Sequence, residues 1–384
     1  MRFSALCLFV LGMTATADPT YFDRVKRVLE SVRTDVSAMT GPAEAAASRV
    51  SAGGHLWVAG HKTLVSELSG RAGGLMCVQS LGDDAPAAGD VVIFGNVGKA
   101  PLPDSLRNSG ALIVVLGDEP VGPTVFCLPV YANENGVSET LASTIPAWVF
   151  TGELVAALTR LGTMPVIFET IGMPGGVPRI QKYQAQGLLF HTDRTVPPVA
   201  AGVVGLAYCD KAVGALDRVQ RECGGKLLRV AQWAAESKRA GKKVHMYSMG
   251  HMFPAEVEET AIGGLFTSTA YYSGFSYIDQ PAYDFDDGDT VVHIGYQHPP
   301  YELLEKVGSS GARIAYVDIL EHRDYRDNQN VIWIDPMWMW ADGCVRIDGY
   351  DVPMLPLSGV INGAIAWEIY RSTSESLGES GGGK

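Results

Sequence analysis

The stretch Leu56-Trp-Val-Ala-Gly-His-Lys-Thr-Leu-Val-Ser-Glu-Leu-Ser-Gly-Arg-Ala-Gly-Gly-Leu-Met76 has a counterpart in Met246-Tyr-Ser-Met-Gly-His-Met-Phe-Pro-Ala-Glu-Val-Glu-Glu-Thr-Ala-Ile-Gly-Gly-Leu-Phe266. The Gly-His pair and the Gly-Gly-Leu run recur in both at one constant spacing of 190 residues. Each copy consists of an apolar run, a glycine that permits a sharp turn, and a segment of helical pattern. The pattern predicts a buried strand that turns into a helix, twice in one chain.

Strands and helices alternate around both copies. In the first half, apolar runs predict strands over 56–59, 75–78, 91–94, 111–116 and 124–128. In the second half, the corresponding runs are 243–248, 289–295, 313–317 and 331–334. Helical spacing of apolar residues covers 21–32, 43–50 and 217–237. Continuously apolar strands that alternate with helices indicate a parallel sheet covered on both faces.

Further matching segments extend the repeat. Gly89-Asp-Val-Val92 corresponds to Gly288-Asp-Thr-Val-Val292, and Ser109-Gly-Ala111 corresponds to Ser310-Gly-Ala312. A period of about 200 residues is too long for a solenoid repeat and fits two tandem domains. The sequence therefore predicts an α/β fold of two tandem α/β/α sandwich subdomains, each with a parallel five-stranded sheet, related by internal duplication.

The predicted boundaries follow changes in composition. We expect a signal peptide at 1–17, a first domain at 18–162, an ordered crossing segment at 163–214, a second domain at 215–371 and a disordered tail at 372–384. Arg2, the apolar run to Met13 and Ala15-Thr-Ala17 are typical of a secretory signal peptide. If it is real, the protein is periplasmic or secreted. Otherwise the protein is cytoplasmic.

Composition excludes several classes. The chain of 384 residues is 47% hydrophobic and has a formal net charge of −12, which indicates a packed globular protein and argues against nucleic-acid binding. No apolar run reaches the roughly 18 residues of a membrane span. The five cysteines beyond the first 17 residues are scattered, which favours small core residues, although pairing of Cys209 with Cys223 is left open.

Both halves resemble the SIS (sugar isomerase) domain family, whose members bind phosphosugars. The resemblance covers about residues 20–160 and 215–371. It depends on the Gly60-His61 turn, the Gly-Asp-Val-Val and Gly-Ala entries to two strands, and Glu134-Asn-Gly-Val-Ser-Glu-Thr140, where the family has Glu-Ile-Gly-Val-Ala-Ser-Thr. It implies a tandem SIS-like protein that binds a small-molecule sugar derivative and needs no cofactor.

The loops that hold phosphate in this family are altered here. The family has serine and threonine, whereas this chain has Gly60-His-Lys-Thr63 and Gly250-His-Met-Phe253 after the first strands, and Gly95-Asn-Val-Gly-Lys99 after a later one. The family's lysine in the late segment aligns with Leu141. The resemblance thus implies binding of a sugar phosphate or other carbohydrate derivative without strong catalysis. The alternative is an aldose–ketose isomerase with Glu134 as its base.

Loops that follow neighbouring parallel strands meet at one crevice, so the ligand site is expected there. The ligand-binding candidates in these loops are Gly60, His61, Lys62, Thr63, Asn96, Lys99, His251, Glu256, Tyr296 and His298. Lys62 and Lys99 predict that the first half holds an anionic group, and His61 or His251 would assist ring opening in an isomerase. The tryptophan-rich stretch 333–340 favours core packing over a sugar-stacking platform.

Other chemistries have less support. Four histidines, at 245, 251, 293 and 298, fall near strand ends, but H-x-x-x-H and C-x-x-C spacings are absent, so no metal site is expected. The G-x-G-x-x-G of a nicotinamide site and the G-x-S-x-G of a serine hydrolase are also absent. The sequence leaves open whether the protein is a homodimer.

Overall fold

The computed structural model describes most of the chain. The described residues are 18–99, 101–118, 122–170, 172–273, 276–277, 284–296, 301–319 and 329–378, without the side chains of Lys99, 268–273 and 276–277. The predicted signal peptide, His298 and the last part of the predicted tail lie outside these residues.

The first half contains a five-stranded sheet in which all neighbours are parallel, as predicted. Its order is β2-β1-β3-β4-β5, with bounds β1 Leu56–Gly60, β2 Val78–Ser80, β3 Val91–Gly95, β4 Leu112–Leu116 and β5 Val125–Leu128. The sequence predicts a strand at 75–78, whereas the observed strand β2 begins only at Val78. Residues 74–76 instead bond to the crossing segment, through Met76 N to Val166 O and Phe168 N to Gly74 O.

The second sheet repeats this parallel order and adds a strand. The series β7-β6-β9-β10-β11 is parallel, and the short strand β8 pairs antiparallel with β7 at the edge. The prediction of five parallel strands was therefore incomplete for this half. The bounds are β6 Val244–Met249, β7 Ser268–Ser273, β8 Ser276–Tyr277, β9 Thr290–Ile294, β10 Arg313–Val317 and β11 Val331–Ile334.

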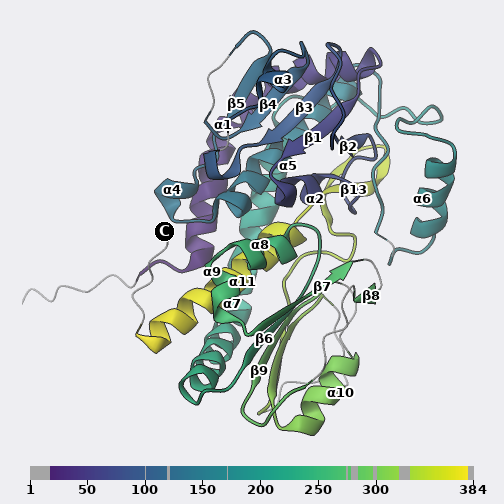
Figure 1. The fold of residues 1–384 in the computed structure, drawn as a ribbon. Helices are drawn as coiled ribbons and strands as arrows, with labels where there is room; N and C mark the ends of the chain where they lie inside the picture. The colour runs from purple at the N-terminus through teal and green to yellow at the C-terminus, as the bar shows by residue number, and fades with distance from the viewer. Residues whose placement is uncertain are drawn as a thin grey trace, which may run out of the picture.

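Helices cover both sheets and fill the space between them (Figure 1). They are α1 Tyr21–Ser51, α2 Lys62–Leu68, η1 Val97–Lys99, α3 Asp104–Arg107, α4 Ala132–Asn135, α5 Glu139–Arg160, α6 Gly176–Ala185, α7 Val203–Arg239, α8 Phe253–Glu259, α9 Ala261–Leu265, α10 Tyr301–Ser310 and α11 Ser358–Leu377. An antiparallel hairpin, β12 Gly343–Ile347 and β13 Tyr350–Pro356, was not predicted. The two parallel sheets flanked by helices form the predicted α/β architecture.

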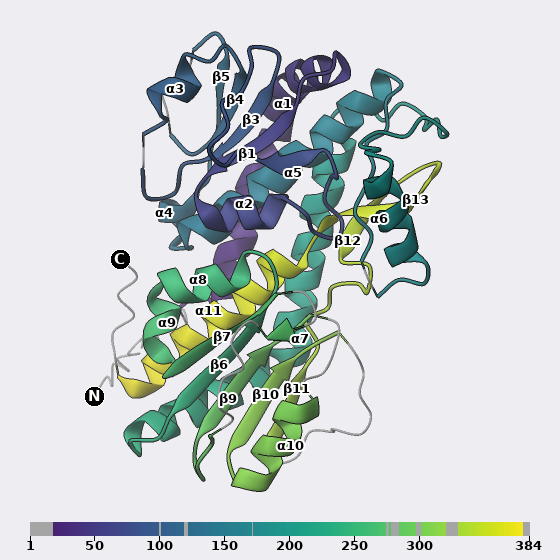
Figure 2. The same cartoon turned by 45° about the vertical axis from the view of Figure 1, so that its right-hand side comes forward.

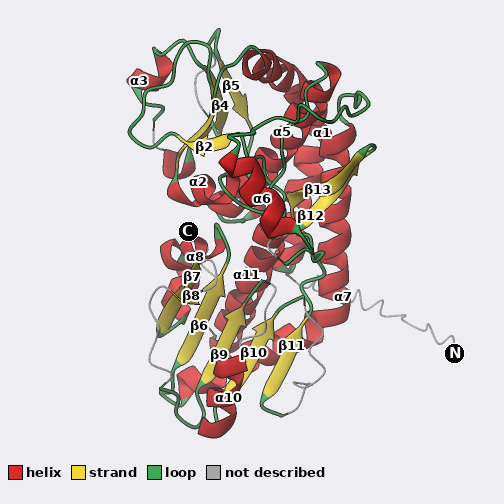
Figure 3. Ribbon diagram, turned by 90° about the vertical axis from the view of Figure 1, so that its right-hand side faces the viewer, coloured by secondary structure: helices red, strands yellow, loops and turns green. Residues whose placement is uncertain are grey.

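Four long helices join the two halves. Helix α1 packs along α5, α7 packs along α11, and α5 and α1 both contact α7. Figure 3 shows the two sheets at opposite ends of the molecule, with long helices running alongside them. Helix α5 is long and apolar enough to cross a membrane, but its apolar stretch is wholly buried within the protein. It is the central core helix, and its burial follows from its packing against α1, α2 and α7.

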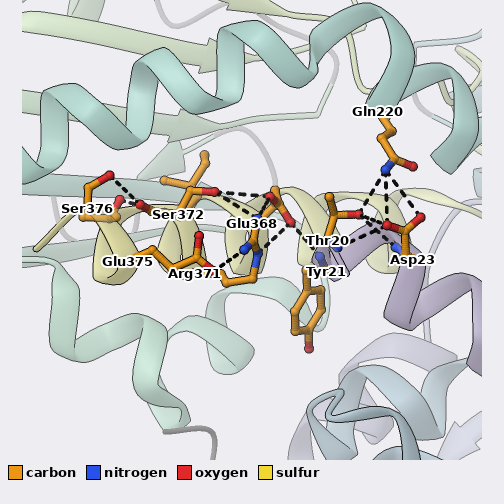
Figure 4. A network of polar contacts seen from close by, with 11 residues as sticks. Thr20, Tyr21, Asp23, Gln220, Glu368, Arg371, Ser372, Glu375 and Ser376 are labelled. Atoms are coloured by element: carbon orange, nitrogen blue, oxygen red, sulfur yellow. Dashed lines mark hydrogen bonds and ion pairs between the residues drawn. The ribbon is translucent and has the colours of Figure 1, made fainter. Parts of the chain in front are cut away.

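The first residues of α1 bind the second half. Thr20 caps the helix through a capping box with Asp23, and the Tyr21 amide donates to Glu368 at 2.6 Å. Gln220 of α7 donates to the Thr20 hydroxyl at 3.1 Å, and Figure 4 shows how Arg371 extends this network along α11. The first helix of one half is therefore held by the last helix of the other.

The prediction of a disordered tail from residue 372 was wrong at its start, because α11 continues past Arg371 to Leu377. Ser372, Thr373 and Ser374 are buried, and the Thr373 hydroxyl donates to the carbonyl of Ala231 on α7. Packing against α7 thus makes a polar sequence helical. Cys209 and Cys223 both lie on α7 as free, buried residues, so they do not form a disulfide.

Candidate functional site

Two glycines form the turn at the carboxyl end of the first sheet. Gly60 ends β1 with a φ of 91° and lies opposite Gly95 of β3. A Cβ atom on Gly60 would lie 2.4 Å from the Gly95 carbonyl oxygen, which is closer than real atoms approach. The His61 amide also donates to that carbonyl, at 3.1 Å. The Gly-His turn is therefore specific for glycine and fixes the direction of the loop that follows.

A cleft of about 560 Å³ opens at these strand ends. Phe94, Leu81 and Leu106 give it an apolar surface. Its polar lining comes from His61, Asp83, Asp84 and Ser105. Clefts at the carboxyl ends of parallel strands are the usual position of ligand sites in such sheets, because the loops after the strands converge there.

A second cleft of about 470 Å³ lies beside the first, and Pro101 lines both. Its lining includes Asn96, Asp118, Tyr131, Glu134 and Glu139. The Asn96 amide donates to the Asp118 carbonyl at 3.2 Å, and the Gly98 amide donates to Glu139 at 2.7 Å. The predicted base Glu134 is exposed on α4 and borders this cleft.

Tyr131 positions the loop before α4. Its φ is 57°, in the left-handed region that is uncommon for a residue with a side chain. Its hydroxyl donates to Asp35 of α1 in a short hydrogen bond. Partial burial and the Asp35 carboxylate raise the pKa of Tyr131 to about 12, so the phenol stays protonated at neutral pH. The second cleft thus contains a neutral phenol beside carboxylates.

Three residues of the predicted anion site meet around one carboxylate. The Glu259 side chain, from α8 of the second half, lies 2.7 Å from Lys62 Nζ and 3.3 Å from His61 Nε2. The Thr63 hydroxyl donates to it at 3.4 Å. The hydrogen bond with Glu259 raises the pKa of Lys62, so the Lys62 ammonium is charged at neutral pH. In this structure, the carboxylate that these three side chains contact belongs to the protein itself.

The second-half candidates are placed differently. The backbone carbonyl of His251 accepts from Ser66 of α2 at 2.7 Å, which joins the two Gly-His segments. Burial, and then the nearby charge of Arg71, lower the pKa of His251 to about 3, so its imidazole is neutral. The Tyr296 hydroxyl donates to Asp342 and its ring packs on Trp338 at 4.9 Å. Neither residue lines the two clefts described above.

Glu256 is buried between the halves and lines neither cleft. It accepts from Trp367 Nε1 at 2.7 Å and forms short hydrogen bonds with Ser138 and Thr140, at the start of α5. Burial raises its pKa to about 7, although hydrogen bonds from Ser138 and Trp367 act in the opposite direction. Its position favours a structural role over the ligand-binding role expected from the sequence.

A related arrangement exists around Glu67 of α2, which is also fully buried. It accepts from Trp148 Nε1 at 3.0 Å and pairs with Arg71. Arg71 in turn lies 2.7 Å from Asp342, which bonds to Ser358 at the start of α11. Each half thus has a buried glutamate that accepts from a tryptophan of its own last helix, α5 in the first half and α11 in the second. The hydrogen-bond network of each glutamate also reaches the start of the last helix of the other half.

Several residues of the site were missed by sequence reasoning. Asp83 and Asp84 lie in the loop that begins with Leu81 and Gly82 after β2, so their position after a predicted strand could have identified them. Ser105 and Glu259 have no such signal, because both come from helices whose packing brings them to the strand ends. Among the described residues, no group of three or more histidine, cysteine, aspartate or glutamate side chains is arranged to hold a metal ion.

Comparison with known proteins gives similarity of fold alone. No protein-family model and no curated protein matches the chain. The C-terminal domain of glucosamine-fructose-6-phosphate aminotransferase from Francisella tularensis aligns with 11% identity and a TM-score of 0.47, over 95% of this chain and 98% of that one. Tagatose-6-phosphate ketose/aldose isomerase from Escherichia coli aligns with 9% identity and a TM-score of 0.44, over 94% of this chain and 92% of that one. At these values, neither similarity assigns a residue role to this chain.

Proposed function

We propose that the protein binds a carbohydrate derivative, in sugar-phosphate or other anionic form, at the carboxyl ends of the first sheet. The observation that supports this most is the pair of adjoining clefts above β1, β3 and β4. Together they place apolar surface next to several oxygen acceptors. Sugars present the same combination, with C–H faces that pack on apolar side chains and hydroxyls that donate hydrogen bonds.

The charges of the described lining suit the hydroxyl end of a sugar. Asp83, Asp84, Asp118 and Glu134 offer carboxylate oxygens, which accept strongly from hydroxyl or ammonium groups. His61 borders the first cleft and also contacts the Glu259 carboxylate. An anionic substituent of the sugar would therefore lie toward His61, Lys62 and Thr63, away from the acidic lining.

Binding is favoured over isomerisation. An isomerase needs a base whose pKa is near neutrality and a partner group to help move the proton. Glu134 is exposed to solvent. Leu141, which aligns with the family's lysine, is fully buried, and a Cβ on Gly363 of α11 would lie 3.0 Å from its Cδ1. A catalytic lysine at this position would not reach the cleft.

Calorimetry with glucosamine 6-phosphate and fructose 6-phosphate tests the binding. Ser105 is exposed and lines the first cleft, so Ser105→Trp should fill it and weaken binding at least tenfold. Asp104 is the matched control, because it is exposed on the same helix and does not line the cleft. Equal affinities in Ser105→Trp and Asp104→Trp would place the ligand elsewhere.

Proton exchange separates binding from isomerisation. The protein is incubated with either sugar phosphate in deuterated water, and NMR follows loss of the C2 proton of glucosamine 6-phosphate or of a C1 proton of fructose 6-phosphate. We expect saturable binding without exchange. Exchange that is lost in Glu134→Gln would establish the isomerase instead, because that substitution keeps the shape of the side chain and removes its basicity.

A further inference from the structure

The Glu259 carboxylate occupies the part of the first-half loop that an anionic ligand would use. It contacts all three side chains of the loop, His61, Lys62 and Thr63. These residues follow β1 in the first half, whereas Glu259 is the last residue of α8 in the second half. The contact therefore joins two segments that are 196 residues apart.

Helices α2 and α8 lie against one another at this point, which Figure 2 shows at the centre of the molecule. The Ser66 hydroxyl donates to the His251 carbonyl at 2.7 Å within the same contact. That hydrogen bond, from a side chain of α2 to the backbone just before α8, joins the two segments independently of Glu259. Removal of the Glu259 charge should therefore leave the helix pair intact.

The ion pair is accessible to solvent and exchangeable. The Lys62 side chain is 65% exposed and that of Glu259 is 30% exposed. Ion pairs in such positions contribute little to stability, because water competes for both partners. A dissolved anion can therefore compete with the carboxylate for these side chains. A carboxylate that remains close by would still repel that anion.

We propose that Glu259 is an internal competitor for the anionic group of the ligand, so that binding of this group releases a contact between the two halves. This inference depends on the proposed function, since it concerns the same loop. The ligand supplies a phosphate or carboxylate, which takes the contacts of Glu259 with His61, Lys62 and Thr63. In the anion-free protein, the same three contacts join Glu259 to the first-half loop.

Binding of inorganic phosphate and of glucosamine 6-phosphate, measured by calorimetry on folded full-length protein, tests the competition. Glu259→Gln should bind both about fivefold more tightly than the unmodified protein. Glu258→Gln removes an equal charge from the neighbouring, exposed position and serves as the control. It should change the affinity by less than twofold. Lys62→Ala introduced together with Glu259→Gln should abolish the gain, because the lysine is the charge that the two anions share.

The outcomes are distinguishable. Equal affinities for glucosamine 6-phosphate in Glu259→Gln and Glu258→Gln would overturn the competition and leave the binding function standing. If both affinities were raised equally, the cause would be a general effect of charge. Absence of binding of either probe in all variants would overturn the competition and the proposed function together. Melting temperatures of the variants confirm that each is folded.

Discussion

The Glu256→Gln substitution should remove a pH dependence of stability that arises at the junction of the two halves. The Glu256 carboxyl is fully buried and accepts from Trp367 Nε1 at 2.7 Å. Ser138 and Thr140 bond to the same carboxyl. Glutamine has the same shape, so it keeps an oxygen for the indole, and its amide donates to the hydroxyls. Only the ability to ionise is lost.

The magnitude follows from the pKa of Glu256, which burial raises from 4.5 to about 7. The folded state keeps a proton that the unfolded chain releases above pH 4.5, so stability decreases as pH rises from about 4.5 to 7. At about 1.4 kcal/mol per pH unit, the loss reaches about 3 kcal/mol and is complete above pH 7. At pH 4.5 and below, this loss is absent.

Urea unfolding at pH 5, 6, 7 and 8 measures the effect as a difference between the two proteins, which removes the contributions of all other titrating groups. The glutamine variant should be about 2 to 3 kcal/mol more stable at pH 8 and close to the unmodified protein at pH 5. Glu258→Gln, at an exposed position, should show no such divergence. A difference between Glu256→Gln and the unmodified protein that stays constant from pH 5 to 8 would refute the reasoning.

Two further substitutions test the local geometry. In urea unfolding, Gly60→Ala should lower the free energy of unfolding by about 3 kcal/mol, because the added Cβ would clash with the Gly95 carbonyl. Gly70 is the control, since it has a φ of 69° and no neighbour within 4 Å. Gly70→Ala should lose only about 1 kcal/mol. Leu141→Lys should cost more than about 3 kcal/mol, since the position is fully buried, and recovery of isomerase activity in a stable variant would contradict this placement.

Local features of the sequence determined the two sheets. Strands β3, β4, β9 and β10 lie where continuous apolar runs predicted them, because a strand covered on both faces needs apolar side chains on both. The Gly60 turn was predicted for a related reason, since a tight approach between neighbouring strands excludes any side chain. Burial and steric exclusion act on each segment almost regardless of its partners, so they leave a pattern that the sequence shows.

The roles of the acidic side chains were decided by the tertiary structure. Glu256 and Glu259 are three residues apart on α8, yet one is buried against Trp367 and the other reaches Lys62 of the opposite half. Leu141 and Ser105 were likewise placed by helix packing. The sequence specified which residues carry charge. Only the docking of α8 against α2 and α11 determined which carboxylate is desolvated and which meets a cation, because both effects depend on neighbours that are distant in the chain.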